Sequence, residues 1–283
     1  MSRAGSIHRE RYRRREDGLD VRGRAWLVIA AQALRALTRK KPFLYLMLVA
    51  WIPSIVRGVQ IYVAANFPQA SFLAVSARTF RDFLDQQELF VFFITVYAGS
   101  GLIADDIRAN ALQLYLSRPI TRMQYVAGKL AALMAALALV TWVPATMLLI
   151  LQPLFAGNTT FIRHNIYLIP AVAMFALVEI AFAAVTMLAL SSVSKSRWFV
   201  AVLYAGFAFF TQAVFGATRV GLQTTTFSWI SPFGNLVQIG DLIFRLQPRY
   251  ETPPTVSALI LILLIVLSAL VLRRRIRAIE VVT

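Results

Sequence analysis

The sequence predicts an all-α integral membrane protein with six transmembrane helices, an interfacial helix before the first of them and short outer helices between the fifth and sixth. Hydrophobic residues make up 59% of the chain and charged residues only 15%, with a mean hydropathy of +0.67. A soluble domain has a much more even balance of the two. Six apolar runs reach about the 20 residues that a helix needs to cross a bilayer, and most charges lie outside those runs.

The apolar runs place the spans at about 43–64, 86–104, 128–152, 167–192, 198–218 and 253–272. The second span is the shortest, because Asp85 and Glu88 stand at its start and Asp105 and Asp106 at its end. With a cytoplasmic N-terminus, most of the 29 Lys and Arg residues fall on the cytoplasmic side, as the positive-inside rule requires. We therefore expect a multi-pass protein of the plasma or inner membrane with both termini in the cytoplasm.

The residues before the first span divide into two parts. Residues 1–21 are rich in Arg and are expected to form a basic, disordered arm close to anionic lipid. They are too basic and too far from an apolar run to resemble a signal peptide. Residues 22–41 have apolar positions at helical spacing with basic flanks, which predicts a helix in the headgroup plane. The alternative is a cytoplasmic extension of the first span, and residues 42–283 form the six-span domain in either case.

The connection between the fifth and sixth spans is too long for a simple turn. It contains the segment GNLVQIGDLIF, residues 234–244, which is apolar but too short to cross a membrane. Short apolar segments of this kind are usually re-entrant or interfacial. The sequence therefore predicts re-entrant or outer short helices here.

A polar stretch separates the second and third spans. Residues 105–117 alternate apolar and polar positions at helical spacing, which indicates a short amphipathic helix. Pro119 ends this helix near Ser117, and Thr121 with Gln124 forms a capping box that starts the third span. The result is a defined polar corner suited to docking, although on spacing alone it could equally be a short helix that seals the turn.

Two ionisable residues lie deep within predicted spans. Arg57 is in the first span and Glu179 is near the middle of the fourth. Because a charge at that depth is costly, both are candidates for a substrate path or gate, and they could pair with one another. The alternatives are that Arg57 extends outward or packs under the outer segments, and that Glu179 is a protonated carboxyl hydrogen-bonded to a neighbouring helix.

Several kinds of chemistry are excluded by the sequence. The chain has no cysteine and only two histidines, His8 and His164, so thiolate sites and the H-E-x-x-H metal motif are absent. Gly128 and Lys129 resemble the end of a P-loop, but Met123 occupies the first glycine position and Leu130 follows the lysine. We expect no catalytic residue, metal or cofactor in this chain. An intramembrane hydrolase is the alternative from another class, and anionic lipid explains the basic charge better than nucleic acid does.

The polar corner carries a family resemblance. The string GSGLIADDIRANALQLYLSRPITRMQYVAGKL, residues 99–130, resembles the region between the second and third spans of ABC-2 type transporter permeases. The shared features are a Leu-Ile run, an acidic turn, an LSxPIxR corner and a Gly-Lys pair. Two aspartates stand where many members have a glutamate, and the Arg-rich arm is unusually long. The matching residues are Leu102, Ile103, Asp105, Asp106, Leu116, Ser117, Pro119, Ile120, Arg122, Gly128 and Lys129.

The resemblance implies that the corner is a cytoplasmic coupling helix that inserts into a separate ABC ATPase subunit. It implies two ATPase copies, which hold ATP and Mg, and a second permease that is either this chain or a homologue. The implied function is ATP-driven transport, most simply export. A secondary transporter or channel is the alternative and would be expected to carry more polar or broken spans at the midplane. The implied ATPase contacts are Asp105, Asp106, Arg108, Asn110, Gln113, Ser117, Arg118, Pro119 and Arg122.

Overall fold

The computed structural model describes residues 25–111 and 120–278, and this part of the chain is helical with no β-strand. The predicted fold class is confirmed, because six helical segments are long and apolar enough to cross a membrane. The basic arm at residues 1–21 lies outside the described residues. The six segments are Lys41–Asn66, Ala77–Arg108, Arg122–Ala156, Leu168–Ser191, Arg197–Leu222 and Pro254–Arg275.

The first span consists of two helices, α2 (Lys41–Ala50) and α3 (Ile52–Asn66), which meet at Trp51. Pro53 has no N–H to donate, so the helical hydrogen bonding is interrupted at this point. The backbone N–H of Ser54 bonds the carbonyl of Trp51 at 3.1 Å, and the carbonyl of Ala50 instead accepts from the buried side chain of Gln87 at 3.1 Å. The break in the first span is therefore stabilised by the second span.

The second span begins about nine residues earlier than its apolar run. After the short 3₁₀ turn η1 (Pro68–Leu73), a capping box between Ser76 and Thr79 starts α4 (Ala77–Ile94). The chain continues through a π-helical turn, η2 (Thr95–Gly99), into α5 (Gly101–Arg108). Charges at the start of α4 do not stop the helix, because tertiary contacts neutralise them.

The third span comprises α7 (Arg122–Ala138) and α8 (Trp142–Ala156). The predicted capping box is confirmed: the Gln124 N–H donates to the Thr121 hydroxyl at 3.2 Å, and the Thr121 N–H donates to the Gln124 side chain at 3.0 Å. Gly157, with φ of +64°, ends α8 in the left-handed conformation that glycine accepts most readily. A short helix, α9 (Thr160–His164), leads into α10 (Leu168–Ser191).

The last third of the chain contains two long helices with two short elements between them. α11 (Arg197–Leu222) begins at a cap from Ser196, and α13 (Pro254–Ala278) ends the described chain. Between them lie the 3₁₀ turn η3 (Ser228–Ile230) and α12 (Pro232–Ile243), which is capped by Ser231. The short helix predicted within residues 234–244 is thus present, beginning slightly earlier.

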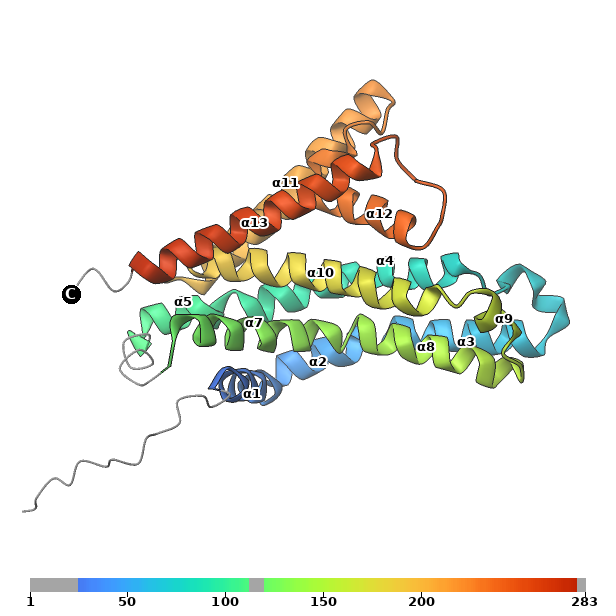
Figure 1. The fold of residues 1–283 in the computed structure, drawn as a ribbon, viewed down its shortest axis with the longest axis horizontal. Helices are drawn as coiled ribbons and strands as arrows, with labels where there is room; N and C mark the ends of the chain where they lie inside the picture. Colours follow the sequence, from blue (N-terminus) through green and yellow to red (C-terminus); the bar gives the residue numbers. More distant parts are fainter. Residues whose placement is uncertain (1–24, 112–119, 279–283) are drawn as a thin grey trace, which may run out of the picture.

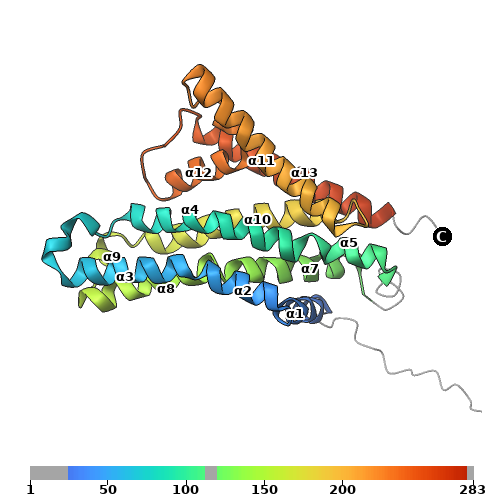
Figure 2. The ribbon, with the colours of Figure 1, turned by 180° about the vertical axis from the view of Figure 1, so that it is seen from behind.

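The spans form two groups in space. α3, α4, α7, α8 and α10 run side by side, while α11 and α13 diverge from them toward one end of the molecule with α12 between (Figure 1). The reverse view agrees (Figure 2). α1 (Ala25–Thr38) is seen end-on in both views, so it crosses the direction of the spans. The α5–α7 corner, the α10–α11 turn and the end of α13 lie at the same end of the molecule as α1.

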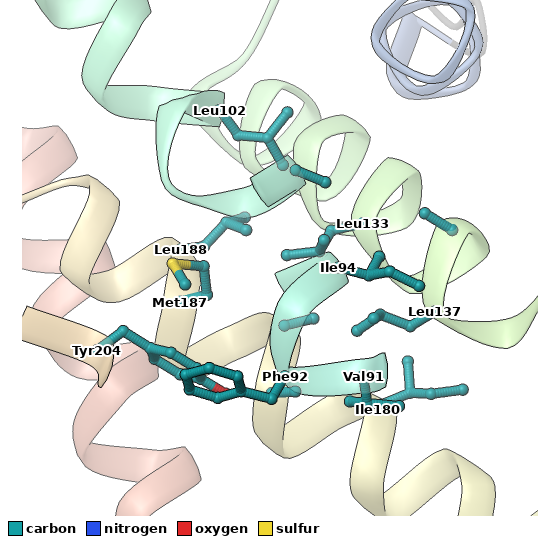
Figure 3. Packing of buried hydrophobic residues seen from close by; sticks show 14 of the residues in the cluster. Val91, Phe92, Ile94, Leu102, Leu133, Leu137, Ile180, Met187, Leu188 and Tyr204 are labelled. Atoms are coloured by element: carbon teal, nitrogen blue, oxygen red, sulfur yellow. The ribbon is translucent and has the colours of Figure 1, made fainter. Parts of the chain in front are cut away.

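The main core lies where the second, third and fourth spans meet. Figure 3 shows Ile94, Leu133, Leu137 and Met187 interdigitating there, and all four are fully buried. A second apolar cluster fills the other half of the bundle between α3, α4, α8 and α10. A smaller third cluster joins α10 to α12 and α13. These three clusters hold the polar residues of the spans in fixed positions.

Candidate functional site

The end of α5 is tied to the start of α7 through Asp106. The Lys129 ammonium lies 2.6 Å from Oδ2 of Asp106, and the Tyr125 hydroxyl donates to the same oxygen at 2.7 Å. Lys129 is only 8% exposed and Tyr125 is 1% exposed. One of the residues expected to contact an ATPase therefore uses its carboxylate to connect the second span to the third.

The end of α10 is tied to the same region through Ser191. Its buried hydroxyl accepts from the backbone N–H groups of Ile103 and Ala104 at 3.1 and 3.0 Å. It also donates to the carbonyl of Ser100 at 2.8 Å. These groups follow the π-helical turn η2, where the ordinary helical hydrogen-bond pattern is interrupted. Ser191 thus satisfies backbone groups that the turn leaves without helical partners.

The other predicted contact residues lie around this connection. Asp105 and Arg108 form an ion pair of 3.4 Å on α5, in which the Arg108 side chain is exposed. Asn110 follows the helix in a left-handed conformation with φ of +52°, and Arg122 is the first residue of α7. Gln113, Ser117, Arg118 and Pro119 lie outside the described residues.

The helix before the first span packs on α7 at the same end. A β-carbon at Gly128 would lie 2.7 Å from Cβ of Ile29 and 2.8 Å from the carbonyl oxygen of Trp26. Such distances are too short for any larger residue without movement of α1. Gly128 therefore permits α1 to approach the backbone of α7 closely, while the neighbouring Lys129 holds Asp106.

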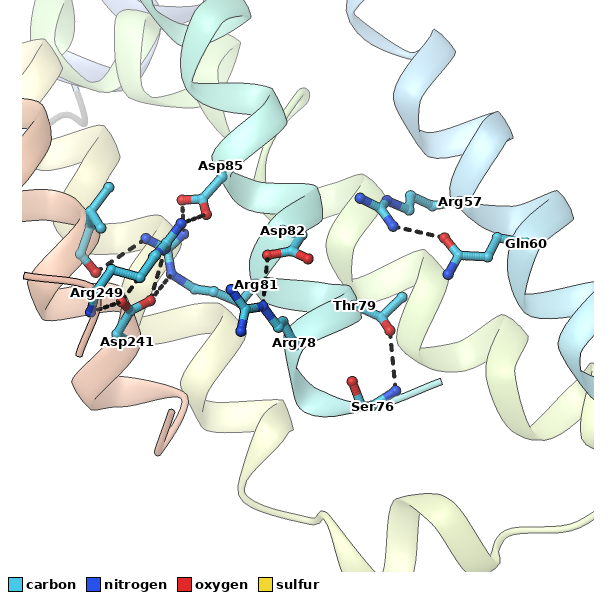
Figure 4. Close-up of polar contacts among 11 residues, drawn as sticks. Arg57, Gln60, Ser76, Arg78, Thr79, Arg81, Asp82, Asp85, Asp241 and Arg249 are labelled. Atoms are coloured by element: carbon cyan, nitrogen blue, oxygen red, sulfur yellow. Dashed lines mark hydrogen bonds and ion pairs between the residues drawn. The ribbon is translucent and has the colours of Figure 1, made fainter. Parts of the chain in front are cut away.

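A second polar site lies at the opposite end of α4 (Figure 4). Arg81 and Asp85, one turn apart on α4, form an ion pair of 2.5 Å. Arg249, from the loop between α12 and α13, contacts Asp85 at 2.7 Å and Asp241 of α12 at 2.8 Å. Arg81 is also 3.6 Å from Asp241. Two arginines and two aspartates thus join α4, α12 and the following loop in one charge-balanced cluster. We call it the outer ion-pair cluster, where "outer" means the end of the molecule away from α1.

The guanidinium of Arg81 is the most deeply buried group in the outer ion-pair cluster. Its side chain is 1% exposed, lies 4.3 Å above the ring of Phe175 and donates to the carbonyl of Val237 at 3.4 Å. A β-carbon at Gly240 would collide with this guanidinium, so the glycine makes room for it. Burial opposes the charge of Arg249, but the carboxylates of Asp241 and Asp85 outweigh it and raise the Arg249 pKa.

Arg57 and Glu179 are not brought together. The Arg57 guanidinium donates to the side chain of Gln60 on its own helix at 2.7 Å, as Figure 4 shows. Glu179 is 2% exposed and lines a small cavity with Glu88 and Tyr204. The suggested pairing is therefore wrong, because Arg57 bonds to its own helix and Glu179 faces a cavity between α4, α10, α11 and α12.

Sequence reasoning missed the outer ion-pair cluster and Glu88. The span predicted at 86–104 leaves Arg81 and Asp85 before its start and places Glu88 in its first turn, because the apolar run begins only there. Their spacing of four residues was an available signal, since such pairs are neighbours on a helix. Nothing in the sequence indicated that Asp241 and Arg249 would meet them.

These observations define a multi-pass helical membrane domain with polar groups held inside it and a defined polar corner at one end. A family model described as "ABC-2 family transporter protein" matches residues 27–275. The chain belongs to this ABC-2 transporter family, and it is a permease subunit of an ABC transporter, a class that normally works with an ATPase subunit. No curated protein matches the sequence.

Proposed function

We propose that this permease exports its substrate, driven by ATP hydrolysis in a separate ATPase subunit that docks at residues 105–122. The observation that carries the proposal is the mechanical connection of this corner. Asp106, Lys129 and Tyr125 join the second span to the third, and Ser191 joins the second to the fourth. A displacement of residues 105–122 would therefore move the second, third and fourth spans together.

The corner transmits work only if it binds the two states of the ATPase unequally. Closure of the ATPase subunits around ATP would displace α5 and the start of α7, and the buried contacts at Asp106 and Ser191 would carry that displacement to α4 and α10. We assign the binding of ATP and Mg to the partner ATPase. The amphipathic helix that the sequence predicts over residues 105–117 is the part that we assign to the ATPase contact.

The orientation follows from charge. Several basic residues lie at the same end of the molecule as the corner (Figure 1). They are Lys40 and Lys41 at the start of the first span, Lys195 and Arg197 at the turn between α10 and α11, and Arg273 to Arg275 near the end of α13. Basic residues favour the cytoplasmic side, so this end faces the cytoplasm of a plasma or inner membrane. α1, which crosses the span direction at this end, would then lie in the headgroup plane.

The assembly is proposed to contain two permeases and two ATPases. We compared the most apolar 18-residue stretch of each span. The buried share of this stretch is 17% in the first span, 22% in the fifth and 17% in the sixth, and about half in each of the other three. In a single chain, most of the apolar surface of these three spans is therefore exposed and available for contact with lipid or with another subunit. We assign part of this surface to a second copy of the chain or a homologous permease, so that the path runs between two protomers.

The docking site is tested by crosslinking. The chain has no cysteine, so Met123→Cys, a 71% exposed position on the first turn of α7, would provide a single thiol at the corner. A bifunctional reagent should join it to the co-purifying ATPase, with a yield that changes when a non-hydrolysable ATP analogue is added. Phe72→Cys, 84% exposed on η1, is the matched control. Equal ATPase crosslinking at both positions would remove the docking assignment.

Coupling is tested separately from docking. Arg122→Glu and Pro119→Ala should leave membrane insertion intact but lower transport per ATP hydrolysed in proteoliposomes. Arg163→Glu, an exposed charge reversal on α9, should leave the ratio unchanged. Full transport in both corner variants would contradict the coupling role, and transport by the permease without any ATPase would favour the secondary transporter.

A further inference from the structure

A small cavity lies inside the molecule where α4, α10, α11 and α12 meet. Its volume is about 10 Å³, roughly room for the centre of one water molecule. Three of the residues around it have polar ends, namely Glu88 of α4, Glu179 of α10 and Tyr204 of α11. The remaining lining is apolar and comprises Val91, Phe92, Phe182, Ala183, Phe233 and Leu236.

Both carboxyl groups have an unsatisfied oxygen. Oε2 of Glu179 and Oε1 of Glu88 are buried, and neither has a hydrogen-bond partner in the described part of the chain. Glu179 as a whole is 2% exposed and Tyr204 is 4% exposed. The ring of Phe92 lies along that of Tyr204 with centroids 5.8 Å apart (Figure 3), so aromatic rings cover one side of the cavity. Buried carboxyl oxygens of this kind need a proton or a cation.

No basic side chain supplies the missing charge. Among the described residues, the cavity lining includes no Lys, Arg or His. The nearest arginines along α4 and the outer loop, Arg81 and Arg249, are held by Asp85 and Asp241 in the outer ion-pair cluster. That cluster has two positive and two negative groups and is already balanced. Glu88 and Glu179 therefore lie inside the membrane domain without a counter-cation.

Two ionised carboxylates at one small, mostly apolar cavity would repel each other and would lack most of their hydration. Inside a bilayer the cost is larger than in a soluble protein. Protonation of one carboxyl removes the repulsion and creates an O–H that can donate to the other, either directly or through one water. Of the titratable groups on the surrounding elements, Tyr204 of α11 lines the cavity beside the pair. The charged groups of α4, α12 and the following loop, Arg81, Asp85, Asp241 and Arg249, contact one another in the outer ion-pair cluster.

We propose that Glu88 and Glu179 form a proton-binding site that holds one proton between two carboxyl groups while α11 and α12 cover the cavity. The covering helices belong to the group of spans that diverges from the main bundle (Figure 1). Movement of that group away from α4 and α10 would admit water and allow the proton to leave.

Infrared spectroscopy of the full chain in lipid nanodiscs tests the proposal directly. A protonated carboxylic acid has a carbonyl stretch that an ionised carboxylate lacks, and this band shifts when H₂O is replaced by D₂O. At neutral pH the wild-type protein should show such a band. Glu88→Gln and Glu179→Gln should each change or remove it, because each variant removes one member of the pair. Glu251→Gln, at an exposed carboxyl in the outer loop, should leave it unchanged.

Two outcomes would overturn the proposal. The first is the absence of a protonated-carboxyl band in the wild type at neutral pH, or an unchanged band in Glu88→Gln and Glu179→Gln alike. The second is loss of the band on addition of sodium chloride at constant pH, with potassium chloride as the comparison, which would show that the pair takes a metal cation. Both glutamine variants are expected to remain folded, because an amide replaces a carboxyl of the same size. Their thermal unfolding curves provide that check.

Discussion

At the scale of single residues, the polar side chains inside this permease act mainly as connectors. Asp106 contacts both Lys129 and Tyr125, and through them joins two spans. Ser191 uses one hydroxyl for three backbone groups of another span. Asp106 neutralises the charge of the buried Lys129, and Ser191 supplies hydrogen bonds to backbone groups beside the π-helical turn. Removal of either side chain would therefore leave a buried polar group without its partner.

Replacing the buried lysine should destabilise the protein. Lys129→Met removes one partner of a pair whose side chains are 9% and 19% exposed, and we expect a loss of about 1–3 kcal/mol in unfolding free energy. Asp106→Asn should cost a similar amount. The double variant should lose less than the two singles together, because no charge is then left unpaired. Denaturant unfolding in detergent measures all three, and strictly additive losses would mean that the pair contributes no coupling.

The exposed carboxyl of Glu251 provides a pH prediction. Thr224 and Thr226 donate to it at 2.5 and 2.8 Å, and these hydrogen bonds lower the Glu251 pKa because they favour the charged form. The contact therefore stabilises the loop above the unfolded-state pKa and is lost as the pH falls through the lower, folded-state value.

Removing both hydroxyls, in Thr224→Val with Thr226→Val, should raise the Glu251 pKa toward its ordinary value. Carbon NMR of a protein labelled at glutamate carboxyls measures the titration. Thr255→Val, an exposed threonine at the start of α13, is the control and should have no effect. An unchanged titration in the double variant would show that the hydroxyls do not hold the carboxylate in solution.

At the scale of elements, α12 is held to the bundle by charge as well as by apolar packing. It contributes Leu236 and Ile239 to the cluster it shares with α10 and α13, while Asp241 meets the two arginines of the outer ion-pair cluster. Because Arg81 is buried, its positive charge depends on these carboxylates. The position of α12 over the Glu88–Glu179 cavity is thus linked to a site at the outer end of α4.

Asp241→Asn should loosen this element. The substitution leaves Arg81 and Arg249 with Asp85 as their shared carboxylate, and we expect a destabilisation of about 2–4 kcal/mol. Hydrogen exchange should increase first in the amides of α12 and the loop that follows. Asp82→Asn, at a more exposed carboxyl whose pair with Arg78 is 3.9 Å long, should change neither quantity. Similar losses in both variants would show that burial of the outer ion-pair cluster is not what holds α12.

At the scale of the whole molecule, the six spans differ in how much of their apolar surface is buried. The second, third and fourth spans bury about half of their most apolar window, whereas the other three expose most of theirs. The exposure of the first, fifth and sixth spans fits the proposed assembly, in which these spans contact the bilayer and a second permease. The connections at Asp106 and Ser191 join the three more buried spans, which is where the proposed coupling requires a rigid link.

The two ends of the molecule should face opposite sides of the membrane. Val193→Cys, in the turn between α10 and α11, and Phe72→Cys, on η1, place single thiols at the two ends. In intact cells a membrane-impermeant thiol reagent should label Phe72→Cys alone, and after lysis it should label both. Labelling of Val193→Cys in intact cells would invert the proposed orientation and place the corner outside.

The sequence by itself determined the number of spans, the fold class and the family. Long apolar runs separated by charges form transmembrane helices, because in a bilayer the backbone N–H and C=O groups of each run must be hydrogen-bonded within a helix. The capping box at Thr121 and Gln124 was also readable, since its partners are three residues apart. Each of these features depends on residues close together in the chain.

Only the tertiary structure decided where the second span starts and which buried charges meet. α4 begins before its apolar run and includes Arg81 and Asp85. Their charges are tolerated there because Asp241 and Arg249, which are distant in sequence, neutralise them. Glu179 faces Glu88 rather than Arg57 because α10 packs against α4 with that side inward. A charge is tolerated in a membrane according to its neighbours in space, and a linear pattern does not contain those neighbours.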